Sequence, residues 1–377
     1  MKNNRRDFIK KSACVASVIT ASGLTAYPKA VARLHDKQVK WPVTEGPDTP
    51  KLCAGVGRDP QMLRMMKQIG VNYGLGGGGR IPWTVANLRE RMAESQKQGI
   101  ATINLMIGGF PNAIYGREGR DEEIENVKES VVAAGIAGIP IVEYNWYAHR
   151  LMEGYYRTYG RGGSGRGAFD YGPVKNLPPL PEVGAYSAEQ LWENLTYFLK
   201  AVIPVAEKAG VRLALHPNDP PAAISRGSEQ IMASLSGWKR LIEIVDSPSN
   251  GITFDPGVTT EIGEDPVEVL RYFGTRDRIN HMHYRNVIVH EPSVKYEEVF
   301  MDVGQANMFA VMREAFRVGY KYYIYPEHPM TLDYDEEHPQ GTSSYILSGG
   351  YTGVAWNVAY CRAMMQAVMS LEIDSTA

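Results

Sequence analysis

The sequence predicts an α/β fold in which eight parallel strands and their helices close into a (β/α)8 barrel, a TIM barrel, over residues 51–377. Two observations support this class: short apolar runs recur eight times, and stretches with helical periodicity lie between them. The alternative is a doubly wound open sheet, but GVGRDP after the first run is a poor match to a phosphate-binding glycine loop.

The eight runs are short and rich in β-branched or aromatic residues, as buried parallel strands are. They occupy residues 51–57, 71–77, 102–108, 139–146, 211–217, 251–257, 279–285 and 322–329. Helices are expected over 85–99, 122–135, 188–210 and 307–319, where apolar residues recur every three to four positions and a glycine often follows. Each strand is therefore expected to be followed by a helix.

Two connections are longer than usual. Residues 147–187 follow the fourth predicted strand, and residues 330–350 follow the eighth. Both leave the carboxyl ends of strands, where such barrels carry their active sites. We expect them to act as lids over the site.

The N-terminus reads as a targeting segment. Arg5 and Arg6 precede a mildly apolar stretch and a small-residue step near residue 32, a pattern that resembles a twin-arginine export signal. We expect residues 1–32 to be this signal, residues 33–50 to be a linker, and the protein to be exported by the twin-arginine machinery to the periplasm or another extracytoplasmic space. The sequence has no run of 18 apolar residues, so no stable membrane span is expected.

Composition excludes several other classes. The leader carries six basic residues and one acidic residue, so its removal takes the net charge from −2 to −7. An acidic protein offers no attractive field for nucleic acid. The three cysteines are scattered and predict neither a disulfide framework nor a thiolate zinc site.

Metal-ligating side chains gather at four strand ends. His216, Asp255, His283 and Glu327 stand at or just after the ends of the fifth to eighth runs. Barrel closure makes these ends neighbours, so we expect the four side chains to share one divalent ion. Each of them alone is also typical of a structural hydrogen bond or turn. His281 and His283 are two residues apart on one predicted strand, so their side chains point to the same face, and the pattern does not decide which of the two is the ligand.

A mixed nitrogen and oxygen ligand set suits Mn²⁺, Fe²⁺, Co²⁺ or Zn²⁺, and Mn²⁺ is the expected metal.

Aromatic residues are frequent at the end of the fourth run and in the segment after it. Aromatic rings pack on sugars, so this supply fits a small carbohydrate ligand.

Four segments resemble the mannonate dehydratase family of xylose-isomerase-like TIM barrels. They are HPNDPP (216–221), GITFDPG (251–257), HYRN (283–286) and PEHP (326–329), and the similarity extends from about residue 51 to 370. The resemblance implies a metal-dependent hydro-lyase that dehydrates D-mannonate or a related aldonate to a 2-keto-3-deoxy acid. It also implies a homo-oligomer without fixing the number of subunits.

The resemblance assigns roles to individual residues. It places His216, Asp255, His283 and Glu327 at the metal-ligand positions. It makes His328 and Tyr351 the candidate acid and base. Tyr144, His281, Arg285 and Arg157 are the candidate substrate-binding residues.

Three positions depart from the family pattern, which usually has Cys at Asp255, Asp at Glu327 and Arg at Tyr325. Replacing a thiolate by a carboxylate makes the ligand set harder and more similar to that of sugar isomerases and epimerases. An isomerase or epimerase, or a 3-keto-glycoside β-eliminating enzyme of the same fold, is therefore one alternative. A non-catalytic carbohydrate-binding barrel is the other.

Overall fold

The computed structural model describes residues 42–339, 347 and 349–375. The predicted leader, residues 1–32, and part of the predicted linker, residues 33–50, lie outside the described residues. Residues 44–369 form one compact unit, to which the barrel belongs. The second unit, residues 1–43 and 370–377, is described only at residues 42–43 and 370–375, the latter being the end of a helix.

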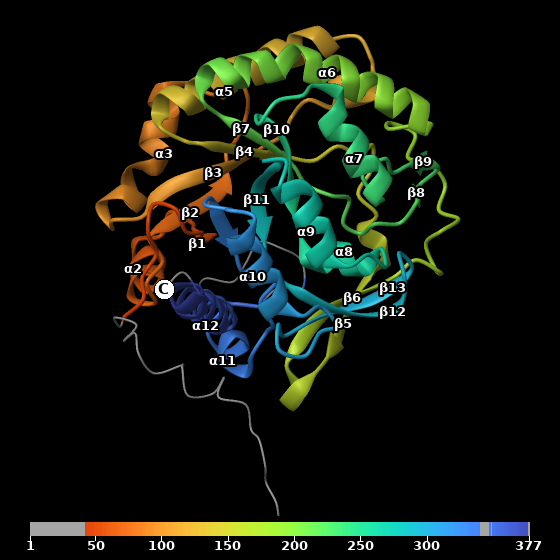
Figure 1. The fold of residues 1–377 in the computed structure, drawn as a ribbon. Helices are drawn as coiled ribbons and strands as arrows, with labels where there is room; N and C mark the ends of the chain where they lie inside the picture. The colour runs from red at the N-terminus through yellow and green to blue at the C-terminus, as the bar shows by residue number, and fades with distance from the viewer. Residues whose placement is uncertain (1–41, 340–346, 348, 376–377) are drawn as a thin grey trace, which may run out of the picture. The chain divides into compact units, whose positions relative to one another are not determined.

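Eight parallel strands form a closed barrel, as predicted (Figure 1). The strands are β1 (Lys51–Gly55), β2 (Tyr73–Gly77), β3 (Ala101–Ile107), β4 (Ile141–Tyr144), β7 (Arg212–Leu215), β10 (Asn250–Phe254), β11 (Ile279–His283) and β14 (Tyr323–Tyr325). Each lies within or overlaps one of the eight predicted runs. The strand order around the barrel is β1-β14-β11-β10-β7-β4-β3-β2, so β7, β10, β11 and β14 are adjacent strands of the barrel.

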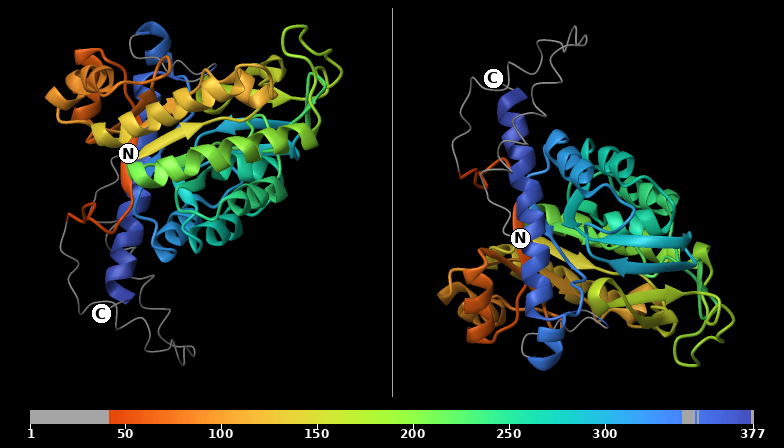
Figure 2. Two further views of the ribbon diagram at one scale, coloured as in Figure 1. Left: turned by 90° about the horizontal axis from the view of Figure 1, so that it is seen from above. Right: turned by 90° about the horizontal axis from the view of Figure 1, so that it is seen from below.

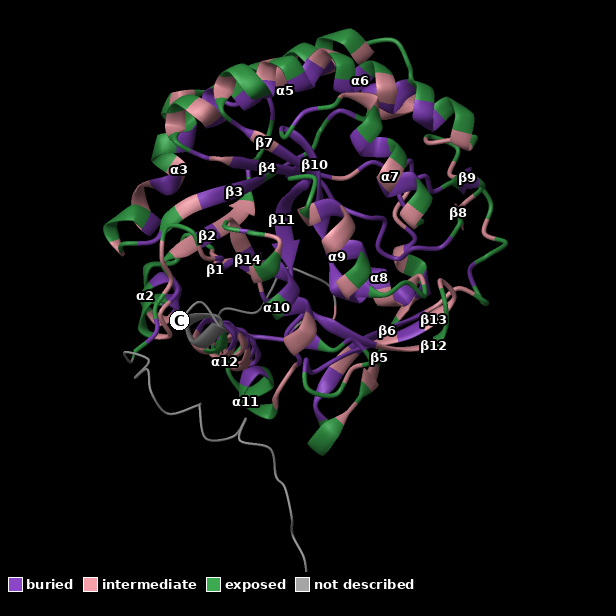
Figure 3. Ribbon diagram, in the orientation of Figure 1, coloured by how far each residue is buried: buried purple, intermediate pink, exposed green. Residues whose placement is uncertain are grey.

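Helices surround this barrel. They are α2 (Pro60–Gln68), α3 (Val85–Lys97), α4 (Pro111–Tyr115), α5 (Arg120–Ala137), α6 (Ala188–Ala209), α7 (Leu235–Ile244), α8 (Pro256–Glu261), α9 (Pro266–Gly274), α10 (Met308–Arg317), α11 (Asp333–Glu337) and α12 (Tyr351–Ser375). Figure 3 shows buried residues along the strands and exposed residues on the outward helix faces. None of the helices formed by the described residues has the length and apolar character needed to cross a bilayer.

Helix α6 shows how local sequence sets these elements. It begins with a capping box between Ser187 and Gln190, and it ends at Gly210, which adopts the left-handed conformation with φ 67°. Five apolar side chains at helical spacing face the barrel and are buried. They are Leu191, Leu195, Phe198, Leu199 and Val202. Their burial anchors α6 on the sheet, as the periodicity predicted.

A second sheet lies outside the barrel. Its strands β5 (Tyr155–Tyr159), β6 (Gly165–Asp170), β12 (Asn286–Glu291) and β13 (Lys295–Val299) pair in the order β12-β13-β6-β5. The two hairpins lie side by side in Figure 2. We call this the accessory sheet. The predicted lid at 147–187 thus contains ordered strands, and its Gly165 pairs with Thr331 of the second long connection. A short hairpin, β8 (Ile224–Ser225) and β9 (Ser228–Glu229), completes the strands of the described segments.

Candidate active site

The predicted ligand side chains lie close together at the ends of four neighbouring barrel strands. His216 directly follows β7, Asp255 follows β10, His283 ends β11 and Glu327 lies two residues beyond β14. One ligand atom from each of the four residues can be chosen so that all lie within 4.8 Å of one another. The structure therefore brings together the residues that the sequence grouped, and it selects His283 rather than His281 for this group.

The cluster is tightly packed around His283. Its Nδ1 lies 3.1 Å from His216 Nε2 and 2.8 Å from Glu327 Oε1. Asp255 Oδ2 lies 4.0 Å from His216 Nε2. All four residues are less than a tenth exposed, so any ion held here is largely screened from water.

The tautomer of His216 fits a metal ligand. Its Nδ1 lies 2.7 Å from the carbonyl oxygen of Pro217, which can only accept, so Nδ1 carries the proton and Nε2 presents its lone pair to His283. Glu327 Oε1 is buried and has no partner with hydrogen-bond geometry in the part of the chain that the structure describes. Converging nitrogen and oxygen lone pairs are the donor set that a divalent transition metal requires.

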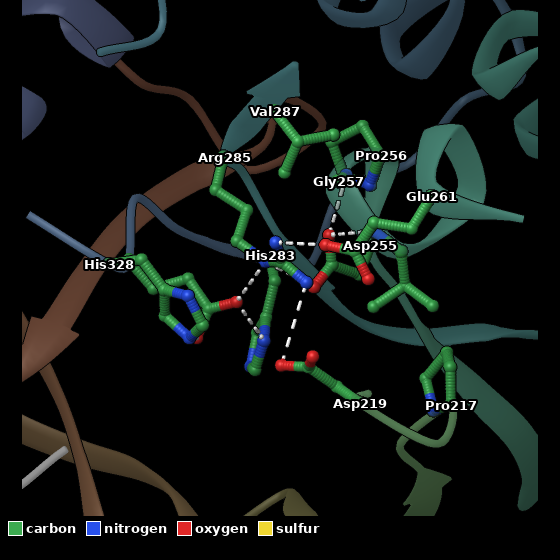
Figure 4. A network of polar contacts seen from close by, with 12 residues as sticks. Pro217, Asp219, Asp255, Pro256, Gly257, Glu261, His283, Arg285, Val287 and His328 are labelled. Carbon is green, nitrogen blue, oxygen red and sulfur yellow. Dashed lines mark hydrogen bonds and ion pairs between the residues drawn. The ribbon is translucent and has the colours of Figure 1, made fainter. Parts of the chain in front are cut away.

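Asp255 is held by the helix that it begins. Its Oδ1 accepts from the backbone N–H groups of Gly257 and Val258 at 2.7 and 3.1 Å, as the N-cap of α8. Its Oδ2 remains for the cluster and for Arg285 Nε, 2.9 Å away (Figure 4). Residue 257 is glycine because a Cβ there would meet Arg285 Nη1 at 2.7 Å.

Arg285 is enclosed by the chain's own carboxylates, which its prediction as a substrate-binding residue did not anticipate. Besides Asp255, its guanidinium lies 2.7 Å from Glu261 Oε1, 3.3 Å from Glu327 Oε1 and 3.6 Å from Asp219 Oδ2. Only 2% of the residue is exposed. Burial by itself would lower the pKa of Arg285, but these carboxylates raise it well above its ordinary value.

Asp219 connects the barrel to the accessory sheet. Its Oδ1 accepts from the hydroxyls of Tyr155, on β5, and Tyr296, on β13, at 2.5 and 3.0 Å. Burial acts to raise the pKa of Asp219, but Arg285, Arg150 and the Tyr155 hydrogen bond lower it well below its usual range. Asp219 is therefore ionised. The accessory sheet thus supplies side chains to the site and is more than a cover.

Glu143, which is not among the predicted site residues, lies next to His283 of the cluster. Its Oε1 is 3.2 Å from His283 Nε2 and accepts from Thr253 Oγ1 at 2.9 Å. His281 belongs to the same group of donor atoms. Burial lowers the pKa of His281 to about 4, so its ring is neutral at pH 7. The sequence did offer a signal for Glu143, because it is the only carboxylate in the apolar run IPIVEYNW.

His328 lies beside the ligand cluster. Its Nε2 is 3.4 Å from Glu327 Oε2, and its Nδ1 is 2.7 Å from Glu298 Oε1, a residue of β13. Burial alone would lower the pKa of His328, but the charges of Glu298 and Glu327 raise it. Glu327 is also affected: burial acts to raise its pKa, whereas His283, His328 and Arg285 lower it well below its usual value. A protonatable ring therefore stands next to an ionised ligand.

Three predicted site residues lie elsewhere. Tyr144 is buried on the outer face of β4, where its ring packs against Phe198 of α6 at a centroid distance of 5.8 Å. Arg157 pairs with Glu336 at 2.6 Å on an exposed part of β5. The Tyr351 hydroxyl donates to the carbonyl oxygen of Met65 in α2 at 3.3 Å. The structure does not bring these three side chains to the cluster.

Comparisons with known proteins give relatives of this chain. Residues 182–372 match a family model described as D-mannonate dehydratase (UxuA). The mannonate dehydratase of Thermotoga petrophila is 30% identical over 313 residues, which cover 73% of this chain and 87% of that protein. The crystal structure of mannonate dehydratase from Streptococcus suis serotype 2 matches with a TM-score of 0.77 and 26% identity, over 86% of this chain and 96% of that one.

A xylose isomerase domain protein from Planctomyces limnophilus also matches. Its TM-score is 0.52 at 13% identity, over 86% of this chain and 98% of that chain. At this identity the likeness concerns the fold alone, and it confirms the xylose-isomerase-like class of barrel.

Proposed function

Because this chain belongs to the mannonate dehydratase family, a family of metal-dependent enzymes, we propose that it removes water from D-mannonate or a closely related aldonate. The protein is a hydro-lyase of the sugar-acid dehydratase type. The product of that reaction is a 2-keto-3-deoxy acid. The observation that carries the proposal is the cluster of His216, Asp255, His283 and Glu327, whose ligand atoms lie within 4.8 Å of one another.

The chemistry that a divalent metal supplies when bound is Lewis-acid polarisation of substrate oxygens, which makes the C2 proton of an aldonate more acidic. His216, Asp255, His283 and Glu327 would hold it. Arg285 and α8 keep the Asp255 carboxylate in place through contacts to both of its oxygens. This chain's own contribution is therefore a rigid, buried frame for the substrate.

His328 is the group to which we assign proton transfer. Its Nε2 faces Glu327 at 3.4 Å, so this ring edge is directed at the ligand cluster. Dehydration needs a base for the C2 proton and an acid for the departing C3 hydroxyl, and proton transfer of this kind contributes about 10²–10⁴-fold in rate. Tyr351 keeps its proposed role only if its hydroxyl leaves the carbonyl oxygen of Met65.

Mn²⁺ is the metal that we propose for the site. Two imidazoles and two carboxylates form a harder set than one with a cysteine thiolate, and carboxylate oxygens favour Mn²⁺ over soft metals. Fe²⁺, Co²⁺ and Zn²⁺ remain competitors in binding assays. Competition titrations of the metal-free protein with these four ions measure the preference directly.

Sugar isomerisation or epimerisation is the second candidate function, because Asp255 puts a carboxylate where the family usually has a cysteine, and Glu327 replaces the family's usual aspartate. The two reactions differ in their products, since only dehydration gives a 2-keto-3-deoxy acid. The same candidate includes β-elimination from a 3-keto-glycoside.

The deciding experiment incubates the purified Mn²⁺-loaded protein with D-mannonate and measures the 2-keto-3-deoxy acid. Chelated protein and a Glu327→Gln variant serve as inactive controls, and His290→Ala, an exposed residue of β12, serves as a matched active control. Release of product only by the loaded wild type and by His290→Ala supports the proposal. Full metal occupancy without product contradicts it.

We also propose that residues 1–32 direct export through the twin-arginine machinery to the periplasm or another extracytoplasmic space. The basis is the Arg5–Arg6 pair followed by an apolar stretch. Replacing both arginines by lysine should retain the protein inside the cell. Unchanged export of that variant, detected by fractionation, contradicts the proposal.

A further inference from the structure

Glu298 of the accessory sheet makes a contact for which the proposed function provides no role. The residue is 2% exposed, and its Oε1 lies 2.7 Å from His328 Nδ1. We propose that Glu298 is a positioning residue that fixes the ring of His328, with the proton on Nδ1 and Nε2 directed at the ligand cluster. The inference deepens the proposed function and rests on it, because it concerns how the assigned proton-transfer group is oriented.

The two ring nitrogens of His328 face different carboxylates. Nδ1 faces Glu298, whereas Nε2 is 3.4 Å from Glu327 Oε2. A carboxylate oxygen accepts hydrogen bonds, so a hydrogen bond between His328 and Glu298 would place the ring proton on Nδ1. A neutral His328 then has its lone pair on Nε2, the nitrogen beside the proposed metal ligand. The tautomer of a histidine is set in this way by the partner of its other nitrogen.

The backbone of His328 adds a second reason for a fixed partner. Its φ is +44°, in the left-handed region that non-glycine residues rarely adopt. Such a conformation persists where the surroundings over-determine it, and it is common at functional sites. Glu298 comes from β13, whose register against β6 and β12 is set by ladder hydrogen bonds. The carboxylate is therefore presented by a rigid element.

Asp219, Glu298 and His328 could instead hold a second metal, since their donor atoms also lie within 4.8 Å. The contacts of Asp219 favour a direct pairing of Glu298 with His328 over such a metal site. Its Oδ1 accepts from two tyrosine hydroxyls, and the guanidinium groups of Arg150 and Arg285 lie near its Oδ2, at 3.5 and 3.6 Å. The positive charges of these two guanidinium groups disfavour a further cation beside Asp219.

The kinetic test compares Glu298→Gln and Glu298→Asp with Glu297→Gln in the Mn²⁺-loaded protein. Glu297 is the matched control because it is the preceding residue of β13 and pairs with Arg166 and His290 instead. We expect Glu298→Gln to lower kcat by about 10²-fold or more with KM and metal content nearly unchanged. Glu298→Asp should restore part of the loss, because it keeps the charge, and Glu297→Gln should behave as wild type.

Double variants separate positioning from general damage. If Glu298 acts through His328, adding Glu298→Gln to His328→Asn should lower kcat no further, because coupled residues are not additive. Multiplicative losses overturn the proposal, as does a Glu298→Gln enzyme with kcat within about threefold of wild type. A second metal equivalent that is lost in Glu298→Gln also overturns it.

A spectroscopic measurement keeps the inference independent of the substrate. In Mg²⁺-loaded protein with ¹⁵N-labelled histidine, the neutral ring of His328 should show a proton on Nδ1, and Glu298→Gln or Glu298→Asp should shift that resonance, with His328→Asn providing the assignment. Unchanged resonances overturn the proposal. If wild type binds metal but does not dehydrate D-mannonate, the proposed function fails, while these resonances still decide the role of Glu298.

Discussion

His216 Nε2 and His283 Nδ1 face each other at 3.1 Å, although 67 residues separate them in the chain. The proton of His216 is on Nδ1, at the carbonyl oxygen of Pro217, so at most one proton lies between the two nitrogens. A divalent ion placed between them satisfies both lone pairs together with the carboxylates of Asp255 and Glu327. Three of the four predictions that follow concern this arrangement and its surroundings, and the other concerns Tyr351.

Asp255→Asn should weaken metal binding and also lower stability. Asparagine can keep the N-cap of α8, but it removes a negative ligand and the charge that faces Arg285. We expect Mn²⁺ affinity, measured by isothermal titration calorimetry, to fall at least about 10-fold. Tm of the metal-free protein should fall as well, because one partner of a buried ion pair loses its charge. Asp265→Asn is the matched control, since Asp265 caps α9 in the same way and is not among the cluster residues. Equal Mn²⁺ affinity in wild type and Asp255→Asn would exclude Asp255 as a ligand.

Arg285→Ala should act mainly on stability. The guanidinium compensates buried carboxylates, and removing one partner of a buried ion pair costs about 3–5 kcal/mol. Chemical denaturation should show this loss, and Arg285→Lys should not recover it, because an ammonium cannot reproduce the fork geometry. Arg276→Ala is the control, because its side chain is exposed. Unchanged stability with a raised KM would instead indicate the substrate-binding role that the sequence predicted.

Tyr351→Phe tests where that hydroxyl acts. The hydroxyl donates to the carbonyl oxygen of Met65, so we expect a loss of about 1 kcal/mol in the free energy of unfolding and kcat within about threefold of wild type. A fall in kcat of about 100-fold or more would show that Tyr351 reaches the substrate. The family resemblance would then describe this position better than the structure does.

Stability of the metal-free protein should depend on pH through His281. Its pKa is lowered to about 4 by burial, against about 6.5 in an unfolded chain. Below pH 6.5 the unfolded chain binds a proton that the native ring does not, so stability falls as pH decreases toward 4, by about 3 kcal/mol in total. His281→Asn should remove this contribution. Parallel curves of unfolding free energy against pH for the two proteins would contradict the assignment.

The barrel was predictable because each strand is a separate apolar run and each long helix shows its own periodicity. Those signals are local, and eight repeats of a strand followed by a helix are compatible with few fold topologies. The ligand cluster was predictable for a related reason: in a parallel barrel, strand ends meet at one face. Tyr144 shows the limit of this kind of prediction. Neighbouring residues of a strand point to opposite faces, so choosing Tyr144 instead of Glu143 on β4 selected a side chain of the outer face and missed the one beside the cluster.

The accessory sheet and the Arg285 network were not predicted. Residues 155–170 are rich in glycine, tyrosine and arginine, and they form the paired strands β5 and β6. Strand β6 also pairs with β13, more than 120 residues later in the chain. Arg285 meets carboxylates from three other segments, so no local pattern reveals that its charge is compensated inside the protein. Contacts between such distant segments leave no local pattern in the sequence.

Anomalous X-ray diffraction from Mn²⁺-soaked crystals, at the manganese edge, tests the central claim most directly. We predict one strong peak per chain within bonding distance of His216 Nε2, Asp255 Oδ2, His283 Nδ1 and a Glu327 carboxylate oxygen. A peak bound instead by Asp219, Glu298 and His328, or fully loaded crystals without a peak among the four residues, would contradict the account.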